Sequence, residues 1–402
     1  MRGYMITLEQ ADQYFIHVYN RNVVFEKGED VYLYDDKGKK YLDFAAGIAV
    51  SALGYSNHKY KNTLKEQINK LIHTSNLFYN QPAILAGEKF IKASGLDKVF
   101  FTNSGTEAIE GSLKLVRKYA YLKNPDSKGH IVAMNHSFHG RSMGALSVTG
   151  TKKYREPFEP LIGNVSFAEF NDFETVKAQI TEDTCAILLE PIQGEGGIYP
   201  AEKEFLKQVR HLCDEKDIVL IFDEIQCGMG RTGTMFAYQQ YEVKPDVIVS
   251  AKALGGGVPV GAFAAINKIA DAFVPGDHGT TYGSNPLVMS AVSCVFDIFE
   301  EEQILKNVQQ TADYLEEKLN TLCEKYPVIK ERRGLGLMQG LEFEIPVAGI
   351  IKEALQKGVI IIAAGTNTIR FVPPLIIEKQ HVDELCDILE SILRVCLKTA
   401  CV

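Results

Sequence analysis

Short hydrophobic runs alternate with amphipathic stretches through the middle of the chain. The runs have the length of buried strands, and Val247–Val249 is entirely β-branched. The runs are Val99–Phe101, His130–Met134, Asn164–Glu169, Cys185–Leu189, Val219–Phe222, Val247–Ser250 and Ala262–Ile266. Stretches with helical spacing lie between several of them, at Gly105–Leu122, Phe173–Ile180 and Ala201–Lys216. Because strands that alternate with helices are typical of parallel sheets, the pattern predicts an α/β fold with a mostly parallel seven-stranded sheet covered by helices on both faces.

The two ends of the chain show different patterns. Residues 1–20 predict a short helix and an exposed segment, and the alternation from Val23 to Phe44 predicts a strand meander followed by a small-residue loop, Ala45–Gly54. Helical spacing resumes at 59–72 and 83–94. Residues 285–326 predict two long helices with a break near Glu301, and the rest predicts a strand, a helix, two strands and a helix, at 335–343, 348–357, 359–363, 369–372 and 378–398.

These patterns predict two domains that pack closely, since no flexible linker separates them. The large domain spans residues 55–300. The smaller α+β domain spans residues 301–402 and includes the N-terminal segment, residues 1–54.

Composition narrows the class of protein. The net charge of −8 argues against nucleic acid as the main partner. Eight cysteines without a Cys-x-x-Cys pair indicate reduced thiols rather than a zinc site or a disulfide framework. With no apolar run near the ~20 residues of a membrane helix and no signal-peptide pattern, we expect a cytoplasmic protein.

Lys252 lies just beyond the hydrophobic run Val247–Val249 and is followed by three glycines, at 255–257. The glycines allow a sharp turn and leave room for a ligand. A buried ammonium is costly, so a lysine here either has a charged partner or acts as a neutral amine that forms a Schiff base with a carbonyl. Taken alone, the position favours a lysine that extends from a strand end to solvent.

Asp223 ends another hydrophobic run, Val219–Phe222, and precedes Lys252 by 29 residues, the length of one strand–connection–strand unit. Neighbouring strand ends could therefore direct an acid and an amine into one pocket. A carboxylate at such a position needs a hydrogen-bonded or cationic partner. A structural salt bridge or a helix N-cap would satisfy the same pattern.

The segment Ser104-Gly105-Thr106 follows a predicted strand and begins a predicted helix, where free N–H groups and hydroxyls suit a phosphate. Ser104 and Glu107 also have the spacing of a capping box, which is compatible with anion binding. After another strand, Phe138 could stack on a flat ring and Arg141 could hold a carboxylate. His136 and His139 lack an accompanying acidic or third ligand, so we expect no metal. A phosphate site, an aromatic face, an acid and a Schiff-base lysine together fit pyridoxal 5'-phosphate, whose ring nitrogen needs an acid.

The chain is similar to a known protein family. It resembles the class III pyridoxal-phosphate-dependent aminotransferases over nearly its whole length, through motifs in a joint order: Asn103-Ser-Gly-Thr-Glu-Ala108, Ser137-Phe-His-Gly-Arg141, Glu190-Pro-Ile-Gln-Gly-Glu-Gly-Gly197, Asp223-Glu-Ile-Gln226 and Thr281-Tyr-Gly-Ser-Asn-Pro286. The resemblance implies fold type I and a homodimer with shared active sites. It also implies transfer of the δ-amino group of N2-acetylornithine to 2-oxoglutarate.

The resemblance further implies roles for individual residues. Lys252 would carry the cofactor, and Asp223 would pair with its ring nitrogen. Ile225 would lie against the ring face opposite Phe138, and Gln226 would lie at the phenolic oxygen. Cofactor contacts would come from Ser104, Gly105, Thr106, Phe138, Asp223, Glu224, Ile225, Gln226 and Lys252, and from Thr281 of the neighbouring subunit. Substrate contacts would come from Tyr19, Arg141, Glu195, Thr280 and Arg370. Glu195 and Arg370 would form a pair that opens when a dicarboxylate binds.

One departure bears on the substrate. Ile48 stands where ornithine aminotransferases usually have a tyrosine, which favours an acylated ornithine over free ornithine. Cys227, in place of the usual threonine, adds a thiol near the cofactor. The alternatives are an ω-aminotransferase acting on succinylornithine, ornithine, 4-aminobutyrate or acylated diaminopimelate precursors. A ligand-binding protein without catalysis is a further alternative, against which the intact Lys252, Asp223 and Arg141 argue.

Overall fold

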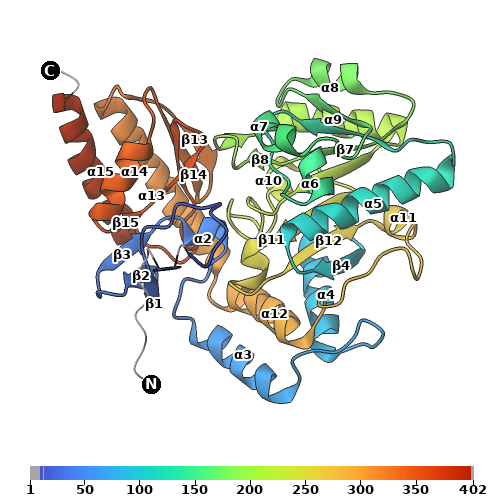
Figure 1. Ribbon diagram of the computed structural model, residues 1–402, viewed down its shortest axis with the longest axis horizontal. Coiled ribbons are helices and arrows are strands. Elements are labelled where there is room, and N and C mark those ends of the chain that lie inside the picture. The colour runs from blue at the N-terminus through green and yellow to red at the C-terminus, as the bar shows by residue number, and fades with distance from the viewer. Residues whose placement is uncertain (1–9, 12, 400–402) are drawn as a thin grey trace.

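A seven-stranded sheet forms the centre of the larger part of the molecule (Figure 1). The computed structural model describes residues 10, 11 and 13–399. From one edge to the other, the strands are β4 (Lys98–Thr102), β12 (Gly261–Ala265), β11 (Val247–Ala251), β10 (Val219–Asp223), β7 (Thr184–Leu189), β5 (His130–Met134) and β6 (Val165–Ala168). Only β12 runs antiparallel to its neighbours, which confirms the predicted, mostly parallel seven-stranded sheet.

Helices cover both faces of this sheet. Successive side chains of a strand point to opposite faces, and both sets of hydrophobic side chains need to be buried. Val247 and Val249 of β11 belong to a core cluster with α5 (Gly105–Lys123), whereas Ile248 belongs to a second cluster with α9 (Lys203–Lys216) and α12 (Pro286–Glu301). Every residue of β11 is buried, because helices lie on each side. The other helices of this part are α3 (His58–Lys70), α4 (Gln81–Ser94), α6 (Met143–Ser147), α7 (Lys152–Arg155), α8 (Phe173–Gln179), α10 (Tyr238–Tyr241) and α11 (Asn267–Ala270).

The N-terminal strands and the C-terminal quarter of the chain lie side by side, at the left of Figure 1. One sheet has the order β1 (Phe25–Glu29), β2 (Tyr32–Asp35), β3 (Lys40–Asp43) and β15 (Val359–Ile360). A second, antiparallel sheet has the order β13 (Ile329–Leu335), β14 (Met338–Phe343), β17 (Thr368–Phe371) and β16 (Ile362–Ala364). Helices α13 (Ile304–Lys325), α14 (Ala348–Gln356) and α15 (Lys379–Thr399) complete this part. The exact division into two domains stays a prediction.

Three local expectations need correction. Strand β13 is missing from the sequence prediction, because its charged residues 330–333 hide the alternation. The single strand expected over 359–363 is two short strands that pair in different sheets. The small-residue loop contains a left-handed turn, α2 (Ala46–Ala49), in which even Ile48 has a φ of 66°. Most of the helix expected within residues 1–20 lies outside the described residues.

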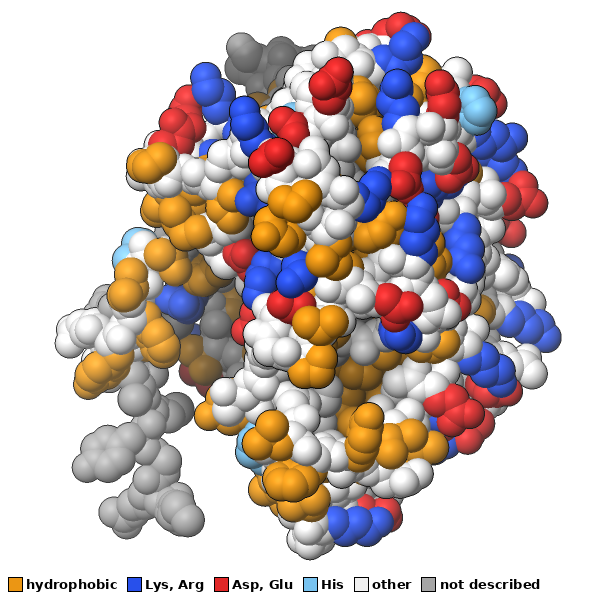
Figure 2. Space-filling view, turned by 90° about the vertical axis from the view of Figure 1, so that its right-hand side faces the viewer, with side chains coloured by type: hydrophobic (Ala, Val, Ile, Leu, Met, Phe, Trp, Pro, Cys, Tyr) orange, Lys and Arg blue, Asp and Glu red, His pale blue; other side chains and the backbone are white. Residues whose placement is uncertain are grey.

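Charged side chains of both signs are spread over the face shown in Figure 2, and hydrophobic side chains gather near its lower edge. Among the exposed apolar residues, Leu77, Phe78 and Tyr79 are consecutive and are 86%, 68% and 95% exposed. Such a run indicates a contact surface. No helix within the described ranges is long and apolar enough to cross a membrane.

Candidate active site

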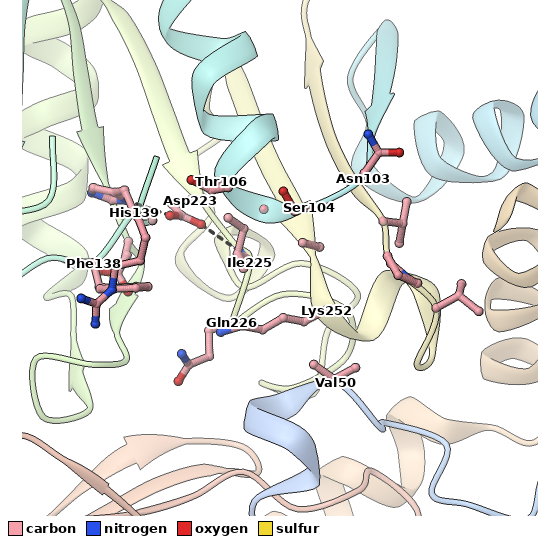
Figure 3. Close-up of a pocket in the computed structure, with 18 of the residues that line it drawn as sticks. Val50, Asn103, Ser104, Thr106, Phe138, His139, Asp223, Ile225, Gln226 and Lys252 are labelled. Carbon is pink, nitrogen blue, oxygen red and sulfur yellow. Dashed lines mark hydrogen bonds and ion pairs between the residues drawn. The ribbon is translucent and has the colours of Figure 1, made fainter. Parts of the chain in front are cut away.

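A cavity of about 500 Å³ opens at the carboxyl ends of β4, β10 and β11. In Figure 3 the Lys252 side chain extends towards Gln226 and Ile225, with Ser104 and Thr106 near the start of α5. Parallel strands place their carboxyl ends along one edge of a sheet, which explains why segments distant in sequence meet there. The structure thus brings together the lysine, the acid and the phosphate segment that the sequence identifies.

Lys252 begins a short turn directly after β11 and has a φ of 49°, in the left-handed region that is rare for a side chain of this kind. Strained backbone of this type is typical of functional sites. Burial, followed by the positive charge of Arg370, lowers the pKa of the Lys252 amine to about 8. The amine is therefore largely neutral at mildly alkaline pH, as a nucleophile must be.

The start of α5 provides N–H groups for an anion. Ser104 is the N-cap, and its Oγ accepts a hydrogen bond from Glu107 N at 3.3 Å, as the capping box predicts. Glu107 instead reaches back one residue further than expected and accepts from Asn103 N at 2.7 Å. A Cβ at Gly105 would lie 2.8 Å from Ile225 Cδ1 and 3.3 Å from Ala251 Cβ, so a larger residue here would displace the Ile225 side chain that lines the cavity.

Asp223 is buried, and its Oδ2 accepts a hydrogen bond from His139 Nδ1 at 2.7 Å. Its other oxygen accepts from Ile225 N at 3.0 Å. The predicted partner of this carboxylate is therefore a histidine that the sequence analysis considered only as a metal ligand. The position of His139 in the motif Ser137–Arg141, after a strand next to β7, is the signal that could have identified it.

Glu190 is a second site residue that the sequence analysis missed. It is buried at the end of β7, lines the cavity, and accepts hydrogen bonds from Phe138 N at 2.9 Å and from Gly194 N at 3.1 Å. Burial, with the charge of Asp223 as a smaller contribution, raises the pKa of Glu190 to about 7. Glu190 thus fixes the backbone of Phe138.

The predicted aromatic residue and the predicted arginine both line the cavity. Phe138 lines the cavity, and the guanidinium of Arg141 lies 5.3 Å from the Phe138 ring centroid and 4.1 Å from that of Tyr154. These contacts orient Arg141, which also lines the cavity. The arginine remains exposed, with its charge available to an anionic ligand.

Glu195 and Arg370 form an ion pair, with Oε1 2.6 Å from Nη1. Arg370 is almost completely buried, and the same nitrogen donates to Gln226 Oε1 at 2.9 Å. Gln226 lines the cavity, so this pair lies directly behind the cavity wall. Arg370 lies on β17 and Glu195 follows β8 (Ile192–Gln193), which means that the pair joins the two parts of the molecule.

Besides Glu195 and Arg370, four other predicted residues lie outside the cavity lining of this subunit. Glu224 requires a correction: its carboxylate accepts from Ala237 N and Tyr238 N, so it holds that segment in place rather than facing the ligand site. Thr280 accepts from Asn103 Nδ2 at 3.1 Å, beside the cavity. Thr281 and Tyr19 are exposed, the latter by 68%.

The site fits pyridoxal phosphate in size and in donor set. Thr106 Oγ1 and the N–H groups at the start of α5 suit its phosphate, Asp223 suits its ring nitrogen, and Phe138 and Ile225 provide apolar contacts. No group of three or more potential metal ligands occurs among residues 10, 11 and 13–399.

A family model for class III aminotransferases matches residues 15–393. The chain belongs to the class III aminotransferases. These are pyridoxal-phosphate-dependent enzymes, and that compound is the cofactor of this chain. An acetylornithine aminotransferase of Clostridium acetobutylicum is 49% identical over 386 residues, which cover 96% of this chain and 100% of that one.

Solved structures of two aminotransferases share the fold. An ornithine aminotransferase of Toxoplasma gondii, with partial occupancy of pyridoxal phosphate at its active site, has a TM-score of 0.93 at 29% identity, covering 98% of this chain and 96% of that one. An N-acetylornithine aminotransferase of Stenotrophomonas maltophilia has a TM-score of 0.83 at 37% identity, covering 95% and 98%. The predicted fold type and transaminase class are confirmed.

Proposed function

We propose that this enzyme transfers the δ-amino group of N2-acetylornithine to 2-oxoglutarate, giving N-acetylglutamate 5-semialdehyde and glutamate, in arginine biosynthesis. The Glu195–Arg370 ion pair carries this proposal, because N2-acetylornithine brings no second carboxylate whereas 2-oxoglutarate does. The 49% identity to an acetylornithine aminotransferase supports the same donor. Ile48, in the turn before the cavity residue Val50, is consistent with it.

The bound cofactor supplies an aldehyde and an electron-accepting ring. Lys252 Nζ holds the cofactor and then moves a proton at the substrate carbon that bears the amino group. Asp223 holds a proton at the ring nitrogen, and His139 fixes the Asp223 carboxylate. Arg141 binds the α-carboxylate of the donor. Arg370 receives the second carboxylate of 2-oxoglutarate when Glu195 moves away.

We further propose that the active unit is a homodimer. The exposed Thr281 then contributes to the phosphate site of the neighbouring subunit, and the apolar run of residues 77–79 becomes buried. Sedimentation at several protein concentrations tests this: a mass of two chains is expected, and a monomer that is fully active refutes it.

Turnover is tested by incubating the purified holoenzyme with N2-acetylornithine and 2-oxoglutarate and measuring glutamate. Glutamate should form with the enzyme and not with the Lys252→Ala variant. If the enzyme transaminates only free ornithine or 4-aminobutyrate, the proposed donor is wrong while the transaminase class still holds.

A further inference from the structure

The backbone that carries Glu195 forms a tight turn, residues 194–198, between β8 and β9 (Tyr199–Pro200). Gly194 N donates to Glu190, and Gly197 has a φ of 124° that favours glycine. A Cβ at Gly196 would lie 2.8 Å from His136 O, and one at Gly197 would lie 2.7 Å from the Tyr199 ring. Neighbouring atoms therefore enclose the turn closely, and the Glu195 side chain is 25% exposed.

The turn packs on a row of three residues from three neighbouring strands. Arg333 of β13 pairs with Gly340 of β14, and Gly340 pairs with Arg370 of β17. Directly opposed residues in antiparallel strands share one face of the sheet. A Cβ at Gly340 would lie 3.0 Å from Ile198 Cβ, so this glycine lets the turn approach the sheet between the two arginines.

The two arginines bind the turn in different ways. Arg370 binds the Glu195 side chain, which a dicarboxylate can replace. Arg333 binds the backbone: its Nε and Nη2 donate to Gly197 O at 3.2 and 2.9 Å. Gly197 O is part of the backbone of the turn, so it cannot rotate away from its arginine as the Glu195 side chain can.

Arg333 is itself held firmly. Its Nη1 contacts the carboxylates of Glu331 and Glu342, and its guanidinium lies 3.9 Å from the centroid of the Tyr199 ring. The side chain is 9% exposed. Because Glu331 and Glu342 balance its charge, Arg333 needs no carboxylate from the turn or from a substrate.

We propose that Arg333 is a positioning residue that keeps the 194–198 turn on the sheet while the Glu195–Arg370 pair is open, so that Glu195 returns to Arg370 before the next amino donor. This role rests on the proposed function. Without Arg333 the turn loosens, Arg370 is left without its carboxylate in the donor half-reaction, and only that half-reaction is impaired. Arg333 thus contributes to dual substrate specificity without touching either substrate.

The test uses Arg333→Gln, with Arg332→Gln as the matched control. Arg332 lies next in the same strand and loses the same charge. It binds Asn320 and Glu316 of α13 and Gln339 of β14, and none of these belongs to the 194–198 turn. Half-reactions are followed separately by cofactor absorbance, with N2-acetylornithine (or whichever monocarboxylate donor the enzyme accepts) and with glutamate. Arg333→Gln should slow the donor half-reaction about tenfold and the glutamate half-reaction less than about twofold, as expected for loss of one charge-assisted contact. Arg332→Gln should change neither.

Affinity for glutarate, an unreactive dicarboxylate, gives a readout besides turnover. Calorimetry should show affinity retained or increased in Arg333→Gln, because Glu195 competes less for Arg370. A merely structural defect would weaken glutarate binding and slow both half-reactions equally, which would overturn the proposal. If Arg333→Gln does not fold, as judged by its melting temperature, Gly197→Ala displaces the same carbonyl and should give the same pattern.

A double-mutant cycle separates the role of Arg333 from the Glu195 switch on which it rests. In a Glu195→Gln background, Arg333→Gln should change the ratio of the half-reactions by less than about twofold, because both act through one contact. Fully additive effects would overturn the role of Arg333 and leave the Glu195 switch intact. Equal loss in both half-reactions from Glu195→Gln alone would overturn the switch itself, and with it the role of Arg333.

Discussion

Glu195→Gln is the substitution that best separates the two half-reactions. The carboxylate oxygen lies 2.6 Å from Nη1 of an arginine that is only 3% exposed, whereas the glutamate is 25% exposed. Loss of a buried pair can cost about 3–5 kcal/mol, but Arg370 also keeps its hydrogen bond to Gln226 at 2.9 Å. We therefore expect the loss of the Glu195 carboxylate to cost about 1.5–3 kcal/mol, the range for a hydrogen bond to a charged group.

This free energy applies only when no substrate carboxylate pairs with Arg370. The half-reaction with N2-acetylornithine should slow by about 10- to 100-fold, at about 1.4 kcal/mol for each factor of ten. The half-reaction with glutamate should keep its rate or become faster, because the substrate carboxylate no longer displaces Glu195.

Stopped-flow absorbance of the cofactor measures each half-reaction alone. Glu204→Gln, which removes one exposed carboxylate from α9, is the control and should change neither rate. Equal losses in both half-reactions, or a loss confined to glutamate, would refute the reasoning and leave the ion pair as a purely structural contact.

Three further results are expected. Lys252→Ala should abolish transamination, since one amine both holds the cofactor and moves the proton; near wild-type turnover in a glutamate assay would contradict this. Asp223→Asn should slow the half-reactions by orders of magnitude and weaken cofactor binding much less, as stopped-flow and equilibrium dialysis would show, because an amide holds the proton on the ring nitrogen poorly. Because the Lys252 pKa is lowered to about 8, its neutral fraction rises between pH 7 and 9. Attachment of pyridoxal phosphate to the apoenzyme, followed by imine absorbance, should therefore accelerate over that range and level off above it, and a rate independent of pH would argue against the lowered pKa.

The parts of the fold that sequence reasoning predicts are those whose side-chain pattern reports burial directly. The buried strand β5 was predicted with both of its ends correct, because hydrophobic residues fill it and polar ones bound it. Strand β13 was missed because Lys330, Glu331, Arg332 and Arg333 form ion pairs on both faces of a strand. Periodicity of hydrophobic residues cannot register a strand whose stabilising contacts are between charges.

The same distinction holds for the residues of the site. The sequence alone identifies Lys252 and Asp223, because a charged residue at the end of a hydrophobic run stands out from its neighbours in the sequence. It does not identify their partners: His139 meets Asp223 across 84 residues, and Arg333 meets Gly197 across 136. Such pairs depend on the order of strands in the sheets and on domain packing, which a single sequence does not encode locally.

The identity of the amino donor is the central claim, and kcat/KM values for four donors with 2-oxoglutarate as acceptor test it most directly. The donors are N2-acetylornithine, N2-succinylornithine, ornithine and 4-aminobutyrate. N2-acetylornithine should have the highest value, and it should exceed ornithine by about tenfold or more, a range that one set of pocket contacts can supply. An equal or higher value for ornithine or 4-aminobutyrate would contradict the account.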